Sequence, residues 1–139
     1  MAAIGTRKLT LSIDSDEVAP EVSTVEIRSA ESDSDFVSFA DAAAGGGRTY
    51  TLALTMTQDA AAGSLWSRVW SELGTTVDIV ARPYGNATPT ATEPHFEGSV
   101  IISEPDGALL GGEADASPSN RFTVEVEWEF VAKPTRVVA

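Results

Sequence analysis

Three glutamates near the end of the chain are the first candidates for chemistry. Glu125, Glu127 and Glu129 occupy every second position between Phe122 and Phe130. Paired carboxylates can serve as general acid and base or bind a cation. On one strand, however, alternate residues lie roughly 7 Å apart, which is too far for one small ion to bridge. The spacing instead favours a row of carboxylates that faces water or a basic partner.

A second candidate is the only histidine, His95, which is flanked by Glu93 and Glu97. General acid–base catalysis could use such a group, but the sequence offers no second catalytic residue to accompany it. A surface contact is the favoured interpretation. The glycines at 45–47 lack the lysine and the serine or threonine of a phosphate-binding loop. We therefore predict no catalytic, cofactor-binding or metal site, and no enzyme activity.

Composition narrows the class of protein further. The 139 residues carry a formal net charge of −12, which argues against a surface that binds nucleic acid. A hydrophobic content of 42% excludes a disordered acidic tail, and the absence of cysteine excludes disulfides. Residues 1–8 lack the apolar segment of a signal peptide, and no apolar run is long enough to span a membrane. The expectation is one soluble domain over residues 1–139, made in the cytoplasm.

The glutamates must be positioned by a strand, because side chains of a strand alternate between its faces. Phe122, Val124, Val126, Trp128 and Phe130 share the face opposite the acids. Similar alternation places Val25 and Ile27 on a core face and predicts a sheet protein. The predicted strands are Lys8–Asp14, Glu21–Ser29, Arg48–Gln58, Thr75–Arg82, His95–Ser103 and Phe122–Phe130. Regularly spaced strands with turn signals indicate a β-sandwich or barrel.

One helix is predicted between the third and fourth strands. Its apolar stripe consists of Leu65, Trp66, Val69, Trp70 and Leu73. Asp59 or Ser64 can cap its N-terminus, and Gly74 suits the left-handed residue that ends a helix. The two tryptophans are expected to seal one open end of the β core. The fold class is thus mainly β, a sandwich with one flanking helix.

Residues 30–47 interrupt the strand pattern. A connection this long is unusual inside a compact domain unless it has a role. It contains Phe36 and Phe39, which a purely flexible loop would not need. They either fold back onto the domain or dock on a neighbouring subunit, because exposed aromatic pairs mark contact surfaces. The loop and the terminal segments are therefore candidate assembly contacts.

Two stretches resemble the tail tube, or major tail, proteins of long non-contractile-tailed bacteriophages. The first is Ser64–Gly98, comprising SLWSRVWSELG and the TTVDIVARPYGNATPTATEPHFEG that follows. The second comprises GGEA at 111–114, FTVEVEWEF at 122–130 and KPTR at 133–136. The resemblance covers about residues 49–136, and only the strand pattern matches before that.

The resemblance implies a β-sandwich with a flanking helix that assembles into hexameric rings, whose inner sheets join into a barrel around a channel. Stacked rings would form a virion tube, assembled in the host cytoplasm on a tape measure protein and bounded by tail terminator and distal tail proteins. Double-stranded DNA would pass through without specific binding. Acidic candidates for the channel wall are Glu125, Glu127, Glu129, Asp78 and Glu97. Some could instead solvate the outer surface or pair with Arg28, Arg48 or Arg82 across an interface.

Two other functions fit the same composition. One is a different virion β-domain, such as a capsid decoration or tail terminator protein, with another symmetry or no polymerisation. The other is a monomeric carbohydrate-binding sandwich that stacks sugars on Trp66, Trp70 or Tyr84. Self-assembly into tubes separates the tail tube function from the monomeric carbohydrate-binding sandwich.

Overall fold

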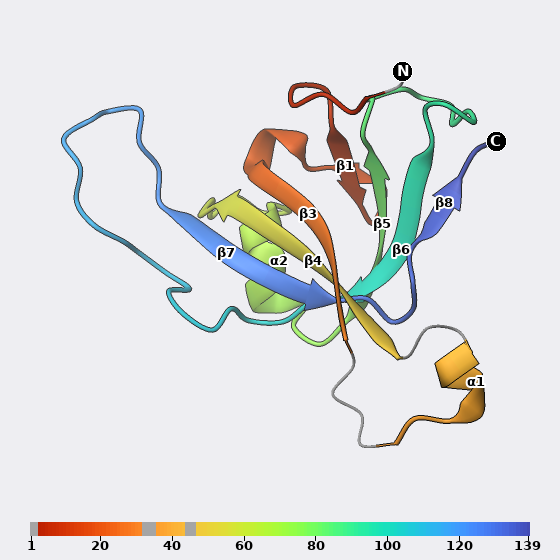
Figure 1. Cartoon of the computed structure of the whole chain (residues 1–139). Helices are drawn as coiled ribbons and strands as arrows, with labels where there is room; N and C mark the ends of the chain where they lie inside the picture. Colours follow the sequence, from red (N-terminus) through yellow and green to blue (C-terminus); the bar gives the residue numbers. More distant parts are fainter. Residues whose placement is uncertain (1–2, 32–35, 44–46) are drawn as a thin grey trace.

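The computed structural model describes residues 3–31, 36–43 and 47–139 and is mainly β. Two antiparallel sheets pack face to face, with the helix α2 beside them (Figure 1). A smaller helical segment, α1, lies beyond the ends of two strands. The predicted fold class is thus confirmed at the level of a mainly β, two-sheet architecture with few helices.

The first sheet has five strands in the order β2-β1-β5-β6-β8. Their bounds are β1 Thr10–Ile13, β2 Asp16–Glu17, β5 Thr76–Arg82, β6 His95–Ile101 and β8 Thr135–Val137. Asp14 and Ser15, both with positive φ, form the turn between β1 and β2, as two-residue hairpin turns require. Strand β8 was not predicted, because three residues are too few to show the alternation of a strand.

The second sheet has three strands in the order β3-β4-β7, with bounds β3 Val22–Glu31, β4 Arg48–Thr57 and β7 Thr123–Glu129. The register places Trp128 opposite Leu52 and Glu127 opposite Ala53. Within β7 the alternation matches the prediction, since Val124, Val126 and Trp128 are buried and the intervening residues are exposed. Phe122, which was predicted to share the buried face, lies before the strand and is 47% exposed. The apolar faces of both sheets therefore meet, as a sandwich requires.

The core lies between the sheets and consists almost entirely of apolar side chains. Trp128 is fully buried there, and its indole Nε1 donates to the carbonyl of Ser103 at 3.0 Å, so its one polar atom is satisfied. Around it the fully buried side chains include Leu11, Ile13, Leu52, Leu54, Met56, Ile79, Val100, Ile102 and Val126.

Helix α2, Leu65–Ser71, closes one side of this core. Leu65 and Val69 are buried, and the Ser64 side chain caps the helix by accepting from the Ser67 amide, as predicted. Gly74 has a φ of 83°, also as predicted. The predicted apolar stripe was too wide, however, because Trp70 is 52% exposed and Leu73 half exposed. Trp70 therefore does not seal the core.

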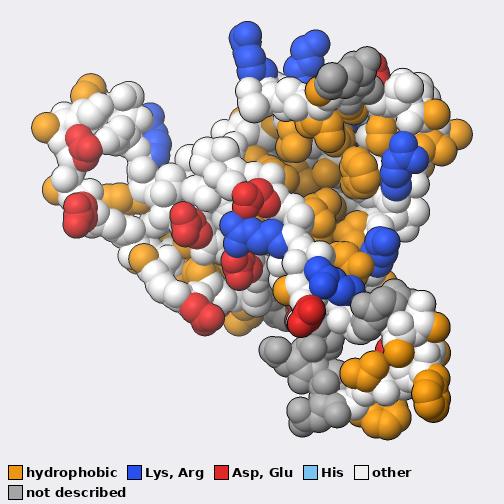
Figure 2. Space-filling view, in the orientation of Figure 1, with side chains coloured by type: hydrophobic (Ala, Val, Ile, Leu, Met, Phe, Trp, Pro, Cys, Tyr) orange, Lys and Arg blue, Asp and Glu red, His pale blue; other side chains and the backbone are white. Residues whose placement is uncertain are grey.

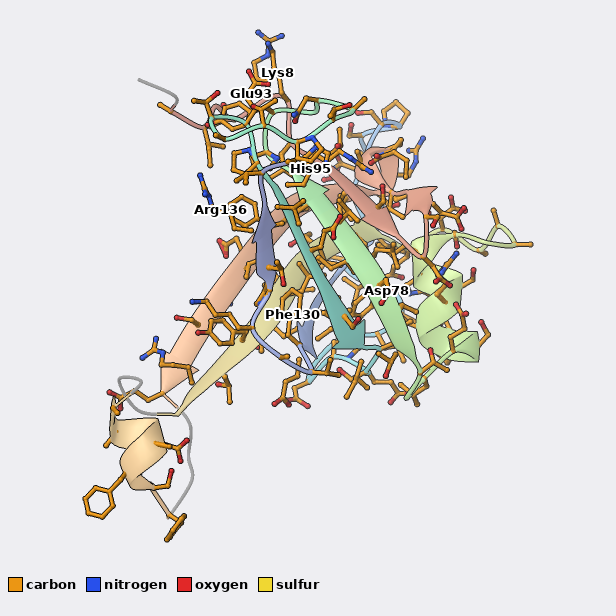
Figure 3. The ribbon with its side chains drawn as sticks, turned by 90° about the vertical axis from the view of Figure 1, so that its right-hand side faces the viewer. Lys8, Asp78, Glu93, His95, Phe130 and Arg136 are labelled. Atoms are coloured by element: carbon orange, nitrogen blue, oxygen red, sulfur yellow. The ribbon has the colours of Figure 1, made fainter. Side chains whose placement is uncertain are left out.

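Among the described residues, no helix covers the opposite side of the gap between the sheets. When the molecule is viewed from the side, α2 lies at one flank of the sandwich and β8 at the other (Figure 3). Strands β3 and β8 are the edges of their sheets on this flank, and a groove lies between these two strands. The remaining helical segments, η1 (Ala19–Glu21) and α1 (Phe39–Ala43), do not line this groove. The two flanks of the sandwich are thus built differently.

Candidate functional site

The outer face of the three-stranded sheet is acidic. Glu125, Glu127 and Glu129 point outward from β7, and Glu26 joins them from β3, so four carboxylates share one face. Figure 2 looks onto this face and shows the acids gathered around one basic side chain. Glu104 and Asp106 extend the acidic surface, since they line the same shallow recess of about 500 Å³ as Glu125 and Glu127.

The basic side chain on this face is Arg28 of β3. Its guanidinium donates to Glu26 and, across β4, to Glu127, with both N–O distances 2.7 Å. The hydrogen bond to Glu26 and the charges of Glu26 and Glu127 raise the pKa of Arg28 above its ordinary value. This pairing of Glu127 with Arg28 lies within one chain, whereas such a pairing was expected across an interface. Four acids and one arginine leave the face with a formal charge of about −3 at neutral pH.

Asp78 and Glu97 lie on a different surface. They belong to β5 and β6, where they point away from the core on the outer face of the five-stranded sheet. Asp78 accepts a hydrogen bond from Ser99 Oγ at 2.6 Å. The five candidate acids are therefore divided between opposite faces of the sandwich. Within one subunit they do not form a single wall.

The candidate assembly contacts lie at the end of the β3–β4 pair. Phe39 begins α1 and is 97% exposed, and Phe36 and Val37 just before it are also exposed. The helical segment is only five residues long, and the bond between the Ser38 hydroxyl and the Asp41 amide helps to form its first turn. Of the two possibilities left open by the sequence, Phe39 does not fold back onto the core. The glycines at 45 and 46 lie outside the described residues.

His95 is not the surface contact predicted from its acidic neighbours. Its side chain is only 4% exposed, and Nε2 donates to the backbone carbonyl of Asn86 at 2.9 Å. The loop 83–94 folds back over β6 and covers the ring, which explains the burial (Figure 3). Among the described residues, no hydrogen bond or ion pair joins His95 to Glu93 or Glu97. The histidine holds a loop in place.

An apolar groove, which the sequence did not reveal, runs between the strand edges β3 and β8. It has a volume of about 540 Å³ and is lined by Ile4, Leu9, Val25, Ile27, Tyr50, Ala81, Pro83, Phe96, Lys133, Pro134 and Arg136. Figure 2 shows it as a hydrophobic hollow with basic side chains at its rim. Ile27 was predicted to lie in the core, but it is 38% exposed because the opposing sheet does not extend over it.

The tryptophans of α2 do not offer a flat surface for sugar stacking. Trp66 and Trp70 meet edge to face, with ring centroids 5.7 Å apart and an interplanar angle of 76°. Trp66 is half buried, and its Nε1 donates to the carbonyl of Leu109. The two rings therefore do not form one flat platform, and this geometry does not favour carbohydrate binding by the pair together.

Two kinds of site are absent from the described parts of the chain. No group of three or more His, Asp or Glu side chains there is placed to hold a metal ion. No helix there is both long and apolar enough to cross a membrane.

No protein-family model matches the chain, and no curated protein matches its sequence. The resemblance to phage tail tube proteins therefore stays a hypothesis about function. What the structure adds is a set of surfaces: an acidic sheet face, an exposed aromatic segment and an apolar groove.

Proposed function

We propose that the chain is the subunit of a self-assembling phage tail tube, a structural protein without enzyme activity. The observation that carries the proposal is the α1 segment, where Phe39 is almost completely exposed beyond the ends of β3 and β4 (Figure 1). An isolated monomer gains nothing from presenting aromatic side chains to water. Subunits that stack upon one another would bury them.

The strand edges support the same proposal. Strands β3 and β8 each pair on one side only, and β3 is ten residues long. Long free edges invite association with other chains, and natural proteins protect them unless they are used in assembly. Joining edges around a closed ring would use them, in keeping with the hexameric rings that the resemblance implies.

The acidic face supports a role as a conduit for double-stranded DNA. A basic wall would bind phosphates by releasing counterions and would hold the DNA in place. Carboxylates such as Glu125 and Glu129 instead repel phosphates within the Debye length, about 8 Å at physiological salt. We propose that the three-stranded sheet faces the channel, because its outer face carries more uncompensated acid than that of the five-stranded sheet. The tape measure, tail terminator and distal tail proteins would be the other partners, and the phage tail the location.

Negative-stain microscopy of the purified protein at high concentration tests the proposal. Hollow tubes or stacked rings are expected. A variant in which residues 31–46 are replaced by a short polar turn should remain folded by circular dichroism and form no tubes. If the wild-type protein remains monomeric, or assembles only into isolated closed shells or caps, the tail tube function is wrong.

The orientation of the acidic face has a separate test, which exploits the lack of cysteine in the chain. Single Glu125→Cys and Asp78→Cys variants place a thiol on the two opposite sheet faces. In assembled tubes, a maleimide attached to a polymer too large to enter the channel should label Asp78→Cys and leave Glu125→Cys unreacted. Both should react after the tubes are dissociated. The reverse pattern would place the five-stranded sheet at the channel.

A further inference from the structure

The groove between β3 and β8 is an incomplete part of the core. Val25, Tyr50 and Phe96, which line it, also pack against the buried cluster, whereas Ile4 and Ile27 at its opening are exposed. Its lining is apolar except for Lys133 and Arg136. Its volume of about 540 Å³ falls within the range of sites that hold an apolar group of several atoms. A surface of this kind is suited to an apolar occupant.

The chain itself presents such a group elsewhere on its surface. The α1 segment, residues 36–43, exposes Phe39, Val37 and Phe36 together. A phenylalanine buries 150–250 Å² when it enters a pocket, so a single aromatic anchor can dominate a contact. The segment and the groove are thus complementary in polarity.

Their charges are complementary as well. Within residues 36–43 the only charged side chain is that of Asp41, and no lysine or arginine occurs between Glu31 and Arg48. The groove is rimmed by Lys133 and Arg136, and Arg7 lines an adjoining recess that shares Leu9 and Val25 with it. Among the described residues these three cations make no ion pair, whereas Arg28, Arg68 and Arg82 do. Basic side chains left without carboxylate partners surround the groove.

We propose that the groove between β3 and β8 receives the α1 segment of a second copy of this chain, with Phe39 as the anchor. In Figure 3 α1 lies beyond the ends of β3 and β4, away from the labelled Arg136 at the groove, which favours a second copy over the same chain. A contact between two different surfaces leaves a free segment at one end of the assembly and a free groove at the other. It can therefore continue from subunit to subunit. This inference rests on the proposed tube function, for which it identifies the acceptor of the loop.

Disulfide trapping tests the contact directly, since the natural chain has no cysteine. Phe39→Cys and Ile27→Cys are made as separate variants, mixed and oxidised. A disulfide-linked dimer should form in this mixture. A mixture of Phe39→Cys with Asp78→Cys, which lies on the outer face of the other sheet, is the matched control and should give only background dimer. An equal yield in the two mixtures would overturn the proposal.

The same chemistry distinguishes a second copy from the same chain. A chain carrying both Phe39→Cys and Ile27→Cys should yield cross-linked dimers and larger species at high concentration. If it instead yields an internally bridged monomer whose amount does not change on dilution, α1 occupies its own groove and the proposal is wrong.

Complementation provides a test without cysteine. Phe39→Ser should remove the anchor, and Ile27→Ser combined with Lys133→Glu should remove the acceptor groove. The sedimentation coefficient of each variant alone should therefore not rise with concentration. Mixed, they still have one intact anchor and one intact groove between them, and a heterodimer of twice the monomer mass should appear. A mixture that remains monomeric would contradict the proposal, as would normal growth of either variant.

The outcomes separate this inference from the proposed function. Tubes in the microscope without a Phe39–Ile27 disulfide would leave the tube function standing and remove the groove as its acceptor. A Phe39–Ile27 disulfide in a protein that never forms tubes would keep the groove as the acceptor of α1 and would contradict the tube function. Tight binding of a small apolar probe that survives in the assembled protein would also remove the groove, since α1 should displace it.

Discussion

The two flanks of the gap between the sheets are closed in different ways. On one flank α2 inserts Leu65 and Val69 into the core, and Trp66 packs against it. On the other flank the edges of β3 and β8 leave a groove in which Ile27 and Ile4 stay exposed. The same kind of side chain is thus covered on one side of the molecule and left in water on the other.

Apolar side chains thus remain uncovered on the groove flank of the core. A short helix could have filled the second flank as α2 fills the first. The chain instead has an aromatic segment that lies outside the fold, at the end of the β3–β4 pair. Residues of the α2 flank should therefore control folding, and residues of the groove flank should control association. Substitutions on each flank test whether folding and association are controlled separately.

The largest effect on folding is expected on the closed flank. Leu65 is almost fully buried, and Leu65→Ala would leave a cavity between α2 and the sheets. The free energy of unfolding should fall by about 2–5 kcal/mol, the usual cost of this substitution in a well-packed core. Urea denaturation followed by circular dichroism measures it. A loss below about 1 kcal/mol would show that the helix is not a structural part of the core.

A smaller effect is expected at Gly98, where the closed core meets the groove. A Cβ added there would lie 2.8 Å from Cε1 and 2.9 Å from Cδ1 of Phe130, and 3.6 Å from Cα of Pro134. Gly98→Ala should therefore cost about 1–3 kcal/mol of unfolding free energy by overpacking. Because Pro134 lines the groove, the variant should also weaken self-association. Denaturation and sedimentation together check both effects; unchanged stability would mean that Phe130 moves freely.

The helix cap should contribute less. Ser64 accepts from the Ser67 amide at 3.2 Å, and Ser64→Ala leaves that amide without its side-chain partner. Capping substitutions of this kind typically cost about 1 kcal/mol. The thermal midpoint should fall, while Ser64→Thr, whose hydroxyl can still accept from the Ser67 amide and donate to the Asp59 carbonyl, should restore most of the loss. Equal losses for the two variants would show that the hydroxyl acts in some other way.

The smallest effect on folding is expected at Phe39. Its side chain is almost completely exposed, so Phe39→Ser should change the unfolding free energy of the monomer by less than about 0.5 kcal/mol. Denaturation of dilute wild-type and variant protein compares them. Self-association should nevertheless be lost. A large destabilisation would show that Phe39 packs against its own chain and would remove the contrast between the two flanks.

The sequence predicted the features that local periodicity determines. Alternation in Phe122–Phe130 gave the buried and exposed faces of β7, and the Ser64 cap and Gly74 were recognised from residue type alone. Strand β8 was missed because it has only three residues, too few to show a period. The mainly β architecture therefore followed from the sequence.

The surfaces could not be predicted in the same way, because they depend on how distant segments come together. Alternation correctly placed Ile27 on the inner side of β3, but only the lateral extent of the opposing sheet decides whether it is covered. The groove unites Ile27, Phe96 and Pro134, which are far apart in sequence. Likewise His95 is buried by a loop whose return over β6 has no periodic signal.

Sedimentation velocity of the wild-type chain over a wide range of concentrations tests whether a second copy covers the groove flank. If a second copy completes the open flank, the sedimentation coefficient should rise steadily with concentration, and Phe39→Ser should remain monomeric throughout. A wild-type protein that sediments as a 14.6 kDa monomer at every concentration would contradict the account.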